Sequence, residues 1–307
     1  MPKKTLRALA AVRTSKARRN LLRLDHAQEF MADVFGENLH AKRVLSLSNG
    51  LAGVLQAAVL SVHAIGMAYA KLNRSAPKHG IKQVDRMLSN GGLAVSELQR
   101  QWCLFVLGDQ REDVVIALDW TDFDDDDHTT LCAYLVTNHG RATPLAWRTI
   151  KKSELEGQRT AAEHDMVERL DGWFPTKIQV TLLADRGFGD QKLYGLLQFL
   201  NWDYVIRFRG NILVESAEGE TRMAAEWVPG NGRPRKLDGA RVTQDRGEAP
   251  SVVVVKKAGM KEAWCLATSL SSKSAAEVVN LYLFCLSRNM TPPQGLDIQR
   301  PQGVHHG

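Results

Sequence analysis

The stretch DVVIALDW at residues 113–120 decides the fold, because an unbroken apolar and β-branched run ends there on an acid and an aromatic residue. Two similar runs follow, LCAYLVTN at 131–138 and ATPLAWRTI at 142–150, with turn-forming residues between them. Short runs rich in β-branched and aromatic residues and bounded by turn signals are typical of β-strands. The sequence therefore predicts three consecutive strands that pair as a meander.

Strands and helices alternate after this meander. Residues 161–171 have apolar side chains at helical spacing, and IQVTLLAD at 178–185 is an apolar strand that ends on an acid. A helix is predicted over 191–201, before a further strand, DYVIRFRG, at 203–210. The order β-β-β-α-β-α-β predicts a mixed sheet whose later strands are reached through crossover helices. We therefore expect an α/β fold of the ribonuclease H-like type with flanking helices.

Helical and β-rich segments flank this core, which we expect over 106–210. Residues 1–105 have apolar side chains at helical spacing, so they predict an N-terminal helical domain. Residues 211–272 are rich in glycine, proline and charge before strand-like runs return, which predicts a β-rich insertion. A last helix is expected to begin near Ser274, within a C-terminal segment that spans 273–307.

Positive charge is concentrated in two places near the N-terminus. The formal net charge is +6, and the segment from Lys3 to Arg23, which includes Arg18 and Arg19, has eight basic residues and no acid. A second basic run, KLNRSAPKHGIKQVDR, spans 71–86. Such runs suit a nucleic acid, because each cation placed on a phosphate releases counterions. A solvated or targeting arm and an ordinary helix connection are the alternatives.

Cysteine spacing and hydropathy exclude several classes of protein. The four cysteines show no C-x-x-C spacing, which argues against a disulfide framework and a structural zinc site and predicts a reducing, cytoplasmic location. No N-terminal stretch has the layout of a signal peptide. Residues 51–70 have no formal charge, but their alanines, glycines and polar residues predict a buried helix, so no membrane partner is expected.

Two acids end predicted strands. Asp119 follows the apolar run of the first strand, and Asp185 ends the run at 178–185. Each acid alone is more typical of a strand end or a turn, but a charge at the end of a buried strand is costly unless it is paired or binds a metal. On adjacent central strands the two carboxylates would converge as oxygen ligands for Mg²⁺. The pair therefore favours a metal site, whereas the aspartates at 122 and 124–127 are interpreted as a solvated turn.

Four segments together resemble the DDE insertion-sequence transposases that have a β-rich insertion in the catalytic domain. In chain order they are KHGIKQVDRMLSN (78–90), IALDWTDF (116–123), LLADRGFGD (182–190) and DYVIRFRG (203–210). The resemblance extends from about Val44 to Tyr282.

This resemblance implies a specific activity. Members of the group bind the terminal inverted repeats of a mobile element, use Mg²⁺ or Mn²⁺ to hydrolyse the phosphodiester at its ends, and join the freed 3′ hydroxyl to target DNA. By position, Asp119 and Asp185 would be the first two catalytic acids and metal ligands. The residues expected to bind DNA are Arg18, Arg19, Arg74, Lys78, Lys82 and Arg86. Members act as dimers or larger assemblies, so a homodimer on DNA is expected.

The third acid of the family is missing from its expected position. The signature Y-x2-R-x3-E-x6-K lies on the last helix, and Tyr282 supplies its tyrosine. The arginine, glutamate and lysine positions hold Cys285, Asn289 and Leu296, and prolines at 292–293 would stop the helix. We interpret this as a truncation or frameshift shortly after Tyr282 that impairs catalysis.

Three functions remain open at this point. The first is a transposase with impaired catalysis, in which only Asp297 or Glu277 could replace the missing acid. The second is a non-catalytic DNA-binding remnant that occupies element ends or inhibits an intact transposase. The third is a general ribonuclease H-like nuclease, although such an enzyme needs neither the basic helical domain nor the β-rich insertion.

Overall fold

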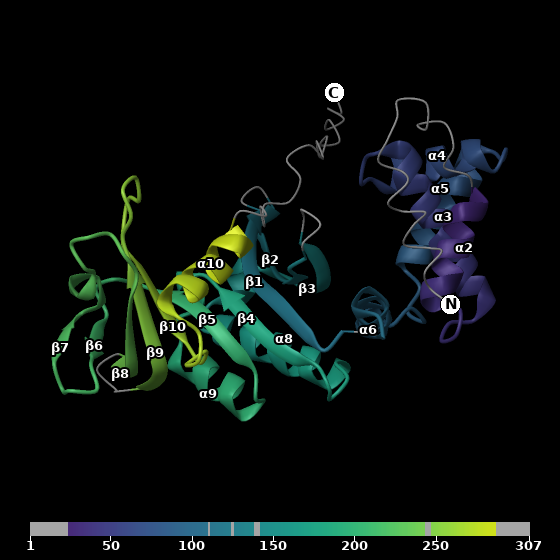
Figure 1. Ribbon diagram of the computed structural model, residues 1–307. Coiled ribbons are helices and arrows are strands. Elements are labelled where there is room, and N and C mark those ends of the chain that lie inside the picture. The colour runs from purple at the N-terminus through teal and green to yellow at the C-terminus, as the bar shows by residue number, and fades with distance from the viewer. Residues whose placement is uncertain (1–23, 110, 124–125, 138–141, 243–246, 287–307) are drawn as a thin grey trace, which may run out of the picture. The chain divides into compact units, whose positions relative to one another are not determined.

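The computed structural model describes residues 24–109, 111–123, 126–137, 142–242 and 247–286. The described residues divide into two compact units, one of which spans residues 24–102 while the other begins at Cys103. The division falls inside helix α6 (Val95–Leu107). Figure 1 labels the elements of both units.

The first unit is helical, as the apolar spacing predicts. Its other helices are α2 (Leu24–Phe35), α3 (Ala41–Ala57), α4 (Val62–Leu72) and α5 (Pro77–Leu88). On α2, the buried residues Ala27, Met31 and Val34 recur at the spacing of one helix face. Burial of such faces against neighbouring helices is what stabilises helices of this length.

The uncharged stretch 51–70 is divided between two helices, so the prediction of one buried helix is wrong. Ala58 ends α3 with a left-handed φ of 53°, and Ser61 caps α4 by accepting a hydrogen bond from the N–H of Ala64 at 3.1 Å. Among the described residues, no single helix has the length and apolar character needed to cross a membrane. Only α3 and α4 together satisfy both criteria, and they are bent by 100° at their break.

Two glycines allow α4 and α5 to approach closely. A Cβ on Gly80 would lie 2.2 Å from the carbonyl oxygen of Gly66, and a Cβ on Gly66 would lie 2.4 Å from the Cα of Ile81. Pro77 occupies the first turn of α5, where its missing N–H has no helical partner to lose. The basic segment thus forms a helix that packs directly on α4.

A ten-stranded mixed sheet forms the centre of the second unit (Figure 1). Its strands are β1 (Asp113–Phe123), β2 (His128–Leu135), β3 (Thr143–Lys151), β4 (Gln179–Ala184), β5 (Asp203–Phe208), β6 (Leu213–Glu215), β7 (Thr221–Met223), β8 (Arg235–Val242), β9 (Gly247–Val255) and β10 (Trp264–Thr268). Strands β1 to β3 form the antiparallel meander, and β4 and β5 continue parallel to β1. The resulting order β3-β2-β1-β4-β5 confirms the ribonuclease H-like fold.

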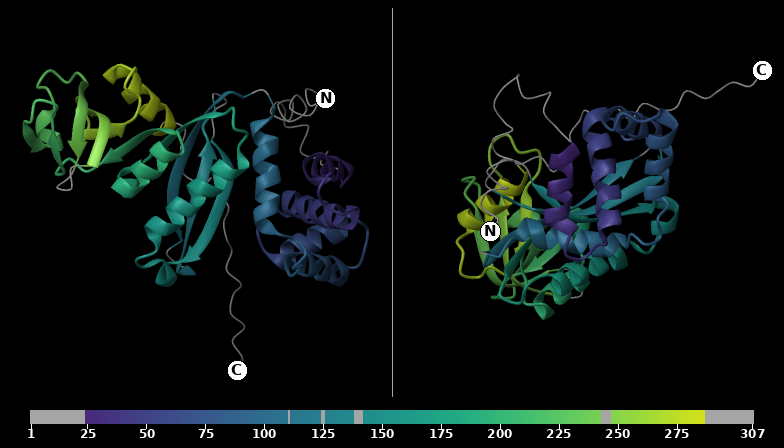
Figure 2. Two further views of the ribbon diagram at one scale, coloured as in Figure 1. Left: turned by 90° about the horizontal axis from the view of Figure 1, so that it is seen from below. Right: turned by 90° about the vertical axis from the view of Figure 1, so that its right-hand side faces the viewer.

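Helices cover both faces of the central strands (Figure 2). Helices α8 (Arg159–Trp173) and α9 (Gln191–Phe199) pack on one face, and α10 (Ala275–Leu286) packs on the other. On β1, Ile116 and Leu118 are buried with α8 and α9, whereas Ala117 is buried with α10. Burial on both faces explains why these strands are continuous apolar runs in the sequence.

The β-rich insertion extends the same sheet. Strand β10 pairs antiparallel with both β5 and β9, and β8 pairs antiparallel with β9 and β6. Trp227 lies in the core of this region, at the end of a short 3₁₀ helix (η4, Ala224–Trp227). It is 2% exposed and donates its indole N–H to the carbonyl oxygen of Val214 at 3.3 Å. The guanidinium groups of Arg222 and Arg235 each lie 5.0 Å from a ring centroid of Trp227.

Candidate active site

Asp119 and Asp185 lie at the same edge of the sheet. Because β1 and β4 are parallel and Leu118 pairs with Ala184, the next residue of each segment is one of the two acids. Ala117 and Leu183, two residues earlier, are both buried on the α10 face. Since side chains alternate along a strand, the carboxylate of Asp119 belongs to that same face, whereas Asp185 lies just beyond the end of β4, at the start of a short 3₁₀ helix. The structure therefore brings together the two acids that the sequence singles out.

The two carboxylates interact electrostatically. Burial and the negative charge of Asp185 together raise the pKa of Asp119 to about 6. Asp185 is exposed, and its Oδ1 accepts a hydrogen bond from the N–H of Gly187 at 2.7 Å. This bond fixes the carboxylate at the start of the short 3₁₀ helix η3 (Arg186–Phe188). Positive charge placed between the two acids would relieve their repulsion.

The donor set fits a divalent cation. Mg²⁺ is commonly bound by one or two carboxylates, with water and substrate phosphate as its other ligands. Burial and the neighbouring charge of Asp185 raise the pKa of Asp119, and a bound cation would favour its charged form. Within the described ranges, no group of three or more His, Cys, Asp or Glu side chains could hold a metal. The described residues therefore offer two acidic side chains that could bind such an ion and no third one.

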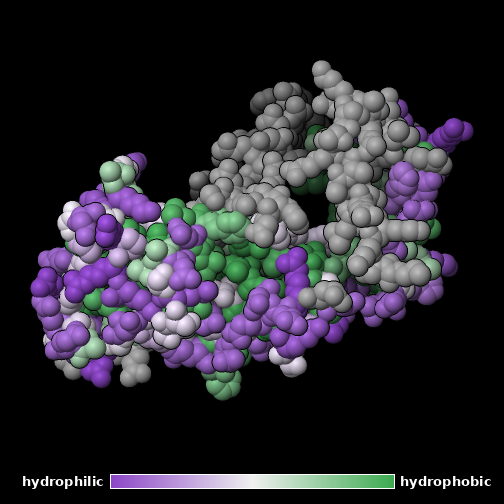
Figure 3. Space-filling view, in the orientation of Figure 1, coloured by the Kyte–Doolittle hydropathy of each residue, from purple (hydrophilic) through white to green (hydrophobic). Residues whose placement is uncertain are grey.

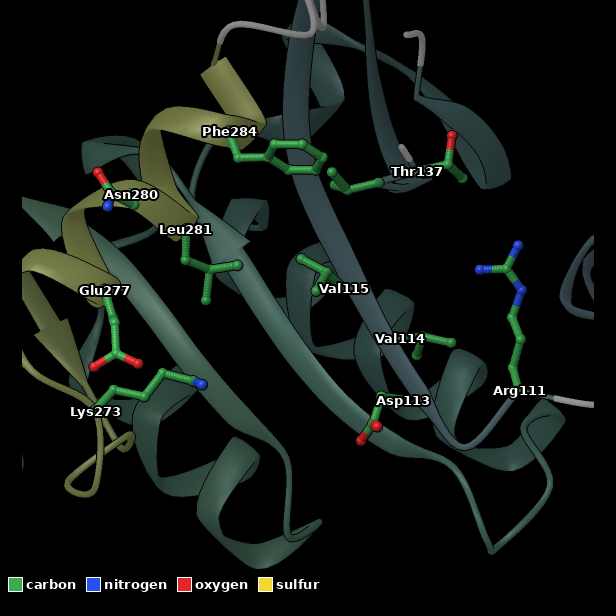
Figure 4. A pocket seen from close by; sticks show the side chains of 11 residues that line it. Arg111, Asp113, Val114, Val115, Thr137, Lys273, Glu277, Asn280, Leu281 and Phe284 are labelled. Atoms are coloured by element: carbon green, nitrogen blue, oxygen red, sulfur yellow. The ribbon is translucent and has the colours of Figure 1, made fainter. Parts of the chain in front are cut away.

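Glu277 does not replace the third acid. Its Oε2 accepts hydrogen bonds from the N–H and the hydroxyl of Ser274, at 2.8 and 2.6 Å, and so caps the start of α10. Glu277 and Asp113 line one groove near the start of β1 (Figure 4). Asp119 lies six residues further along β1, about 20 Å from Asp113. The other candidate, Asp297, lies outside the described residues, as do Asn289 and Leu296.

The groove that contains Glu277 is separate from the two acids. It has a volume of about 720 Å³ and lies between α10, the start of β1 and the residues that directly follow β2. Figure 3 shows hydrophobic residues gathered in this region of α10 and the sheet. The groove is lined mainly by Val114, Val115, Val136, Leu281 and Phe284, with Arg111, Asp113, Lys273 and Glu277 as its charged residues. Because neither Asp119 nor Asp185 lines it, the groove is not the candidate metal site.

A cluster of three side chains on the α8 face, near Asp185, was not predicted from the sequence. Glu163 of α8 is only 3% exposed, and its Oε1 accepts the indole N–H of Trp120 at 2.8 Å. The same oxygen lies 3.5 Å from Nε of Arg159, whose guanidinium lies 4.9 Å from a ring centroid of Trp120. A Cβ on Gly187 would be 3.0 Å from Asp185 Oδ1 and 3.8 Å from Nη2 of Arg159. The arginine and the carboxylate therefore border the same small space.

Two further arginines lie next to Asp185. Arg186 follows it in the chain, and Arg207 lies on the neighbouring strand β5. Arg186 donates to Oε1 of Glu262 at 3.1 Å, and Arg207 of β5 contacts the same oxygen. Arg207 is largely buried and lies 5.8 Å from a ring centroid of Trp264. One carboxylate thus partners two guanidinium groups, which leaves net positive charge on this side of Asp185.

The predicted DNA-binding residues of the first unit gather on α5. Lys78, Lys82 and Arg86 are exposed and follow one another at four-residue spacing, so they share one face of the helix. Arg74 is exposed in the turn before α5, with a φ of 51°. Arg18 and Arg19 lie outside the described residues.

The acidic segment after Asp119 is only partly the turn that was expected, because Asp122 still lies in β1 and pairs with Thr129 of β2. Asp122 lies near the end of β1, and Asp127 has a φ of 51° immediately before β2. The carboxylate of Asp127 accepts a hydrogen bond from the hydroxyl of Ser153 at 3.1 Å. The aspartates at 124 and 125 lie outside the described residues.

Comparisons with known proteins add little to this geometry. No family profile and no curated protein matches the sequence. Among solved structures, the chain is similar to Marinitoga piezophila Argonaute in complex with a 5′ OH guide RNA and target DNA, with a TM-score of 0.24 and 13% identity over 69% of this chain and 31% of that one. For the complex with guide RNA alone, the TM-score is 0.26 and the identity 12%, over 72% and 34% of the two chains. The chain thus spans about a third of these structures. Similarity at this level carries no weight, so the assignment of the fold depends on the sheet topology.

Proposed function

We propose that the chain is a DNA-binding protein of the DDE transposase type, in which Asp119 and Asp185 hold Mg²⁺ or Mn²⁺ against a DNA phosphate. The observation that carries this proposal is the parallel pairing of Leu118 with Ala184, which puts both acids at one edge of the sheet. Two of the four segments that resemble the transposases contain these acids. The resemblance and the geometry therefore support the same pair of residues.

Each group at the site has a distinct role in this proposal. When bound, the cation supplies positive charge to the phosphate, which is the main requirement of phosphoryl transfer. Asp119 and Asp185 bind and orient it, and the N–H of Gly187 keeps Asp185 in place. In the first unit, the basic face of α5 binds the phosphates of the inverted repeats. A second copy of the chain would bind the other end of the element.

We further propose that strand cleavage is impaired. The described part of α10 has Glu277 as its one acid, and Glu277 lies near the other end of β1. Two carboxylates bind a divalent ion more weakly than three and leave its position less defined. The origin of this loss can be tested in the encoding DNA, where R-x3-E-x6-K in another frame after the Tyr282 codon would establish a frameshift.

Calorimetric titration with Mn²⁺ tests the metal site. The wild-type chain is expected to bind Mn²⁺ at neutral pH, whereas Asp119→Asn and Asp185→Asn should each lose most of this affinity because each removes one of two charged ligands. Asp113→Asn is the matched control, since it neutralises an exposed acid at the other end of β1. Unchanged Mn²⁺ affinity in the Asp119 and Asp185 variants would exclude the site.

A non-catalytic DNA-binding protein is the second candidate, and the position of Glu277 favours it. Nicking of supercoiled plasmid in Mn²⁺, measured beside DNA binding, separates the two candidates. DNA binding without nicking supports the non-catalytic protein. Nicking that Asp119→Asn abolishes supports a weakened transposase, and nicking that this variant retains contradicts both candidates.

A further inference from the structure

We propose that Arg159 is a phosphate-binding residue of this site and that Glu163 and Trp120 position it. Its ligand would be a DNA phosphate that lies against Asp185. This inference rests on the proposed function and adds to it a third protein contact with the substrate.

The guanidinium of Arg159 is held on one side and open on the other. Its Nε lies 3.5 Å from Oε1 of Glu163, and its Cζ lies over the ring of Trp120, 4.9 Å from a ring centroid. Its Nη2 borders the space in front of Gly187, which Asp185 Oδ1 also borders. The side chain is 51% exposed, so these outer N–H groups remain accessible. Guanidinium groups presented in this way bind phosphate oxygens with paired, charge-assisted hydrogen bonds.

Glu163 has the properties of a positioning residue. A carboxylate that is 3% exposed must be paired or hydrogen-bonded, and its Oε1 serves both Trp120 and Arg159. Because Trp120 directly follows Asp119 in β1, the hydrogen bond to Glu163 links the arginine to the strand of the first acid. Arg159 can therefore keep its place before any DNA is bound.

Charge balance at the edge of the sheet supports this role. A divalent ion would neutralise the two carboxylates, so the charge of the phosphate would have to be compensated by other cations. Arg186 is directed to Glu262, with which it forms an ion pair at 3.1 Å. Arg159 is the cation whose outer nitrogen borders the same space as Asp185. Arg159 is itself paired with Glu163, so it is singled out by this position, which would allow a direct contact with the phosphate.

DNA binding in Ca²⁺ tests the inference, because Ca²⁺ can occupy an oxygen site without the measurement depending on cleavage. A fluorescein-labelled DNA duplex is titrated in Ca²⁺ and in EDTA at matched ionic strength. Arg159→Ala is expected to weaken binding in Ca²⁺ by about tenfold, the loss expected for a charge-assisted contact, and to change binding in EDTA little. The magnitude of the slope of log affinity against log salt concentration should decrease by about one unit.

Arg169→Ala is the matched control. Arg169 lies on the same helix and forms an ion pair with Asp165 at 2.8 Å, so its removal deletes the same charge away from the site. Arg159→Lys keeps the positive charge but lacks the paired N–H donors of a guanidinium group, so it should show intermediate DNA affinity. Glu163→Gln keeps an acceptor for Trp120 but loses the ion pair, so it should weaken DNA binding in Ca²⁺ several-fold. Calorimetric Ca²⁺ affinity and thermal unfolding should stay at wild-type values in all of these variants.

The outcomes separate this inference from the function on which it rests. Equal DNA affinity in Ca²⁺ for Arg159→Ala and Arg169→Ala would overturn the role of Arg159 and leave the carboxylate site intact. A parallel loss of Ca²⁺ affinity in Glu163→Gln would overturn its positioning role. If the wild type does not respond to Ca²⁺, or if Asp119→Asn responds equally, the proposed function fails and this inference fails with it.

Discussion

Burial raises the pKa of Asp119 to about 6, above its ordinary value of 3.8, and the negative charge of neighbouring Asp185 adds to this effect. When no cation is bound and the pH lies between about 4 and about 6, Asp119 is protonated in the folded protein but ionised in the unfolded chain. The folded state binds more protons in this window, so the contribution of Asp119 to stability falls as the pH rises from about 4 to about 6. Above pH 6 this contribution of Asp119 to stability is lost completely.

Asp119→Asn should therefore stabilise the metal-free protein above pH 6. We expect its free energy of unfolding to exceed the wild-type value by about 1 to 2 kcal/mol at pH 7.5, after allowance for partial solvent exposure, and the difference to vanish near pH 4. Urea unfolding in EDTA at pH values from 4 to 7.5 measures this difference in the free energy of unfolding. Adding Mn²⁺ at pH 7.5 should stabilise the wild type but not the variant. A constant difference at every pH would contradict the carboxylate repulsion.

The sheet could be predicted because its central strands are buried on both faces and are therefore unbroken apolar runs, such as 113–120. The break between α3 and α4 could not be predicted. It depends on the left-handed φ of Ala58, and alanine is a residue type that normally continues a helix. The joining of the insertion to the sheet depends on the pairing of β10 with β5, residues far apart in the chain. Local sequence patterns do not contain that information.

Gly80→Ala should destabilise the helical unit. Its Cβ would lie 2.2 Å from the carbonyl oxygen of Gly66, so α4 and α5 would have to separate. Overpacking of this kind costs about 1 to 3 kcal/mol, which outweighs the gain in helix propensity. Thermal unfolding followed by circular dichroism measures the effect. Gly91→Ala is the control, because no atom lies within 4 Å of its added Cβ. Equal melting temperatures for the two variants would show that the close contact does not exist.

The candidate site was only partly predictable. Asp119 and Asp185 stand out because each ends an apolar run, and parallel strands bring such ends to one edge. Arg159 and Glu163 are spaced like an ordinary surface ion pair on a helix. What makes Glu163 unusual is its burial and its bond to Trp120, 43 residues away in the chain. That relationship arises only when α8 packs on the sheet.

Neutralising the basic face of α5 should weaken DNA binding uniformly. The triple variant Lys78→Ala, Lys82→Ala, Arg86→Ala removes three exposed cations on one helix face. The slope of log affinity against log salt should fall by about 2 to 3 units. A control triple variant, Arg100→Ala, Arg148→Ala, Lys151→Ala, removes cations that already have acidic partners. If both triple variants reduce the slope equally, α5 has no special role in DNA binding.

Gly187→Ala should weaken metal-dependent DNA binding and leave the fold intact. The added Cβ would lie 3.0 Å from Asp185 Oδ1 and 3.8 Å from Nη2 of Arg159, so it would fill the space that both groups border. The φ of Gly187 is not positive, and an alanine can therefore adopt its backbone conformation. We expect DNA affinity in Ca²⁺ to fall several-fold, affinity in EDTA to stay constant, and the melting temperature to change little. Gly172→Ala, whose Cβ would meet no atom within 4 Å, serves as the control. If Gly187→Ala binds DNA in Ca²⁺ as tightly as this control, the phosphate does not lie between Asp185 and Arg159.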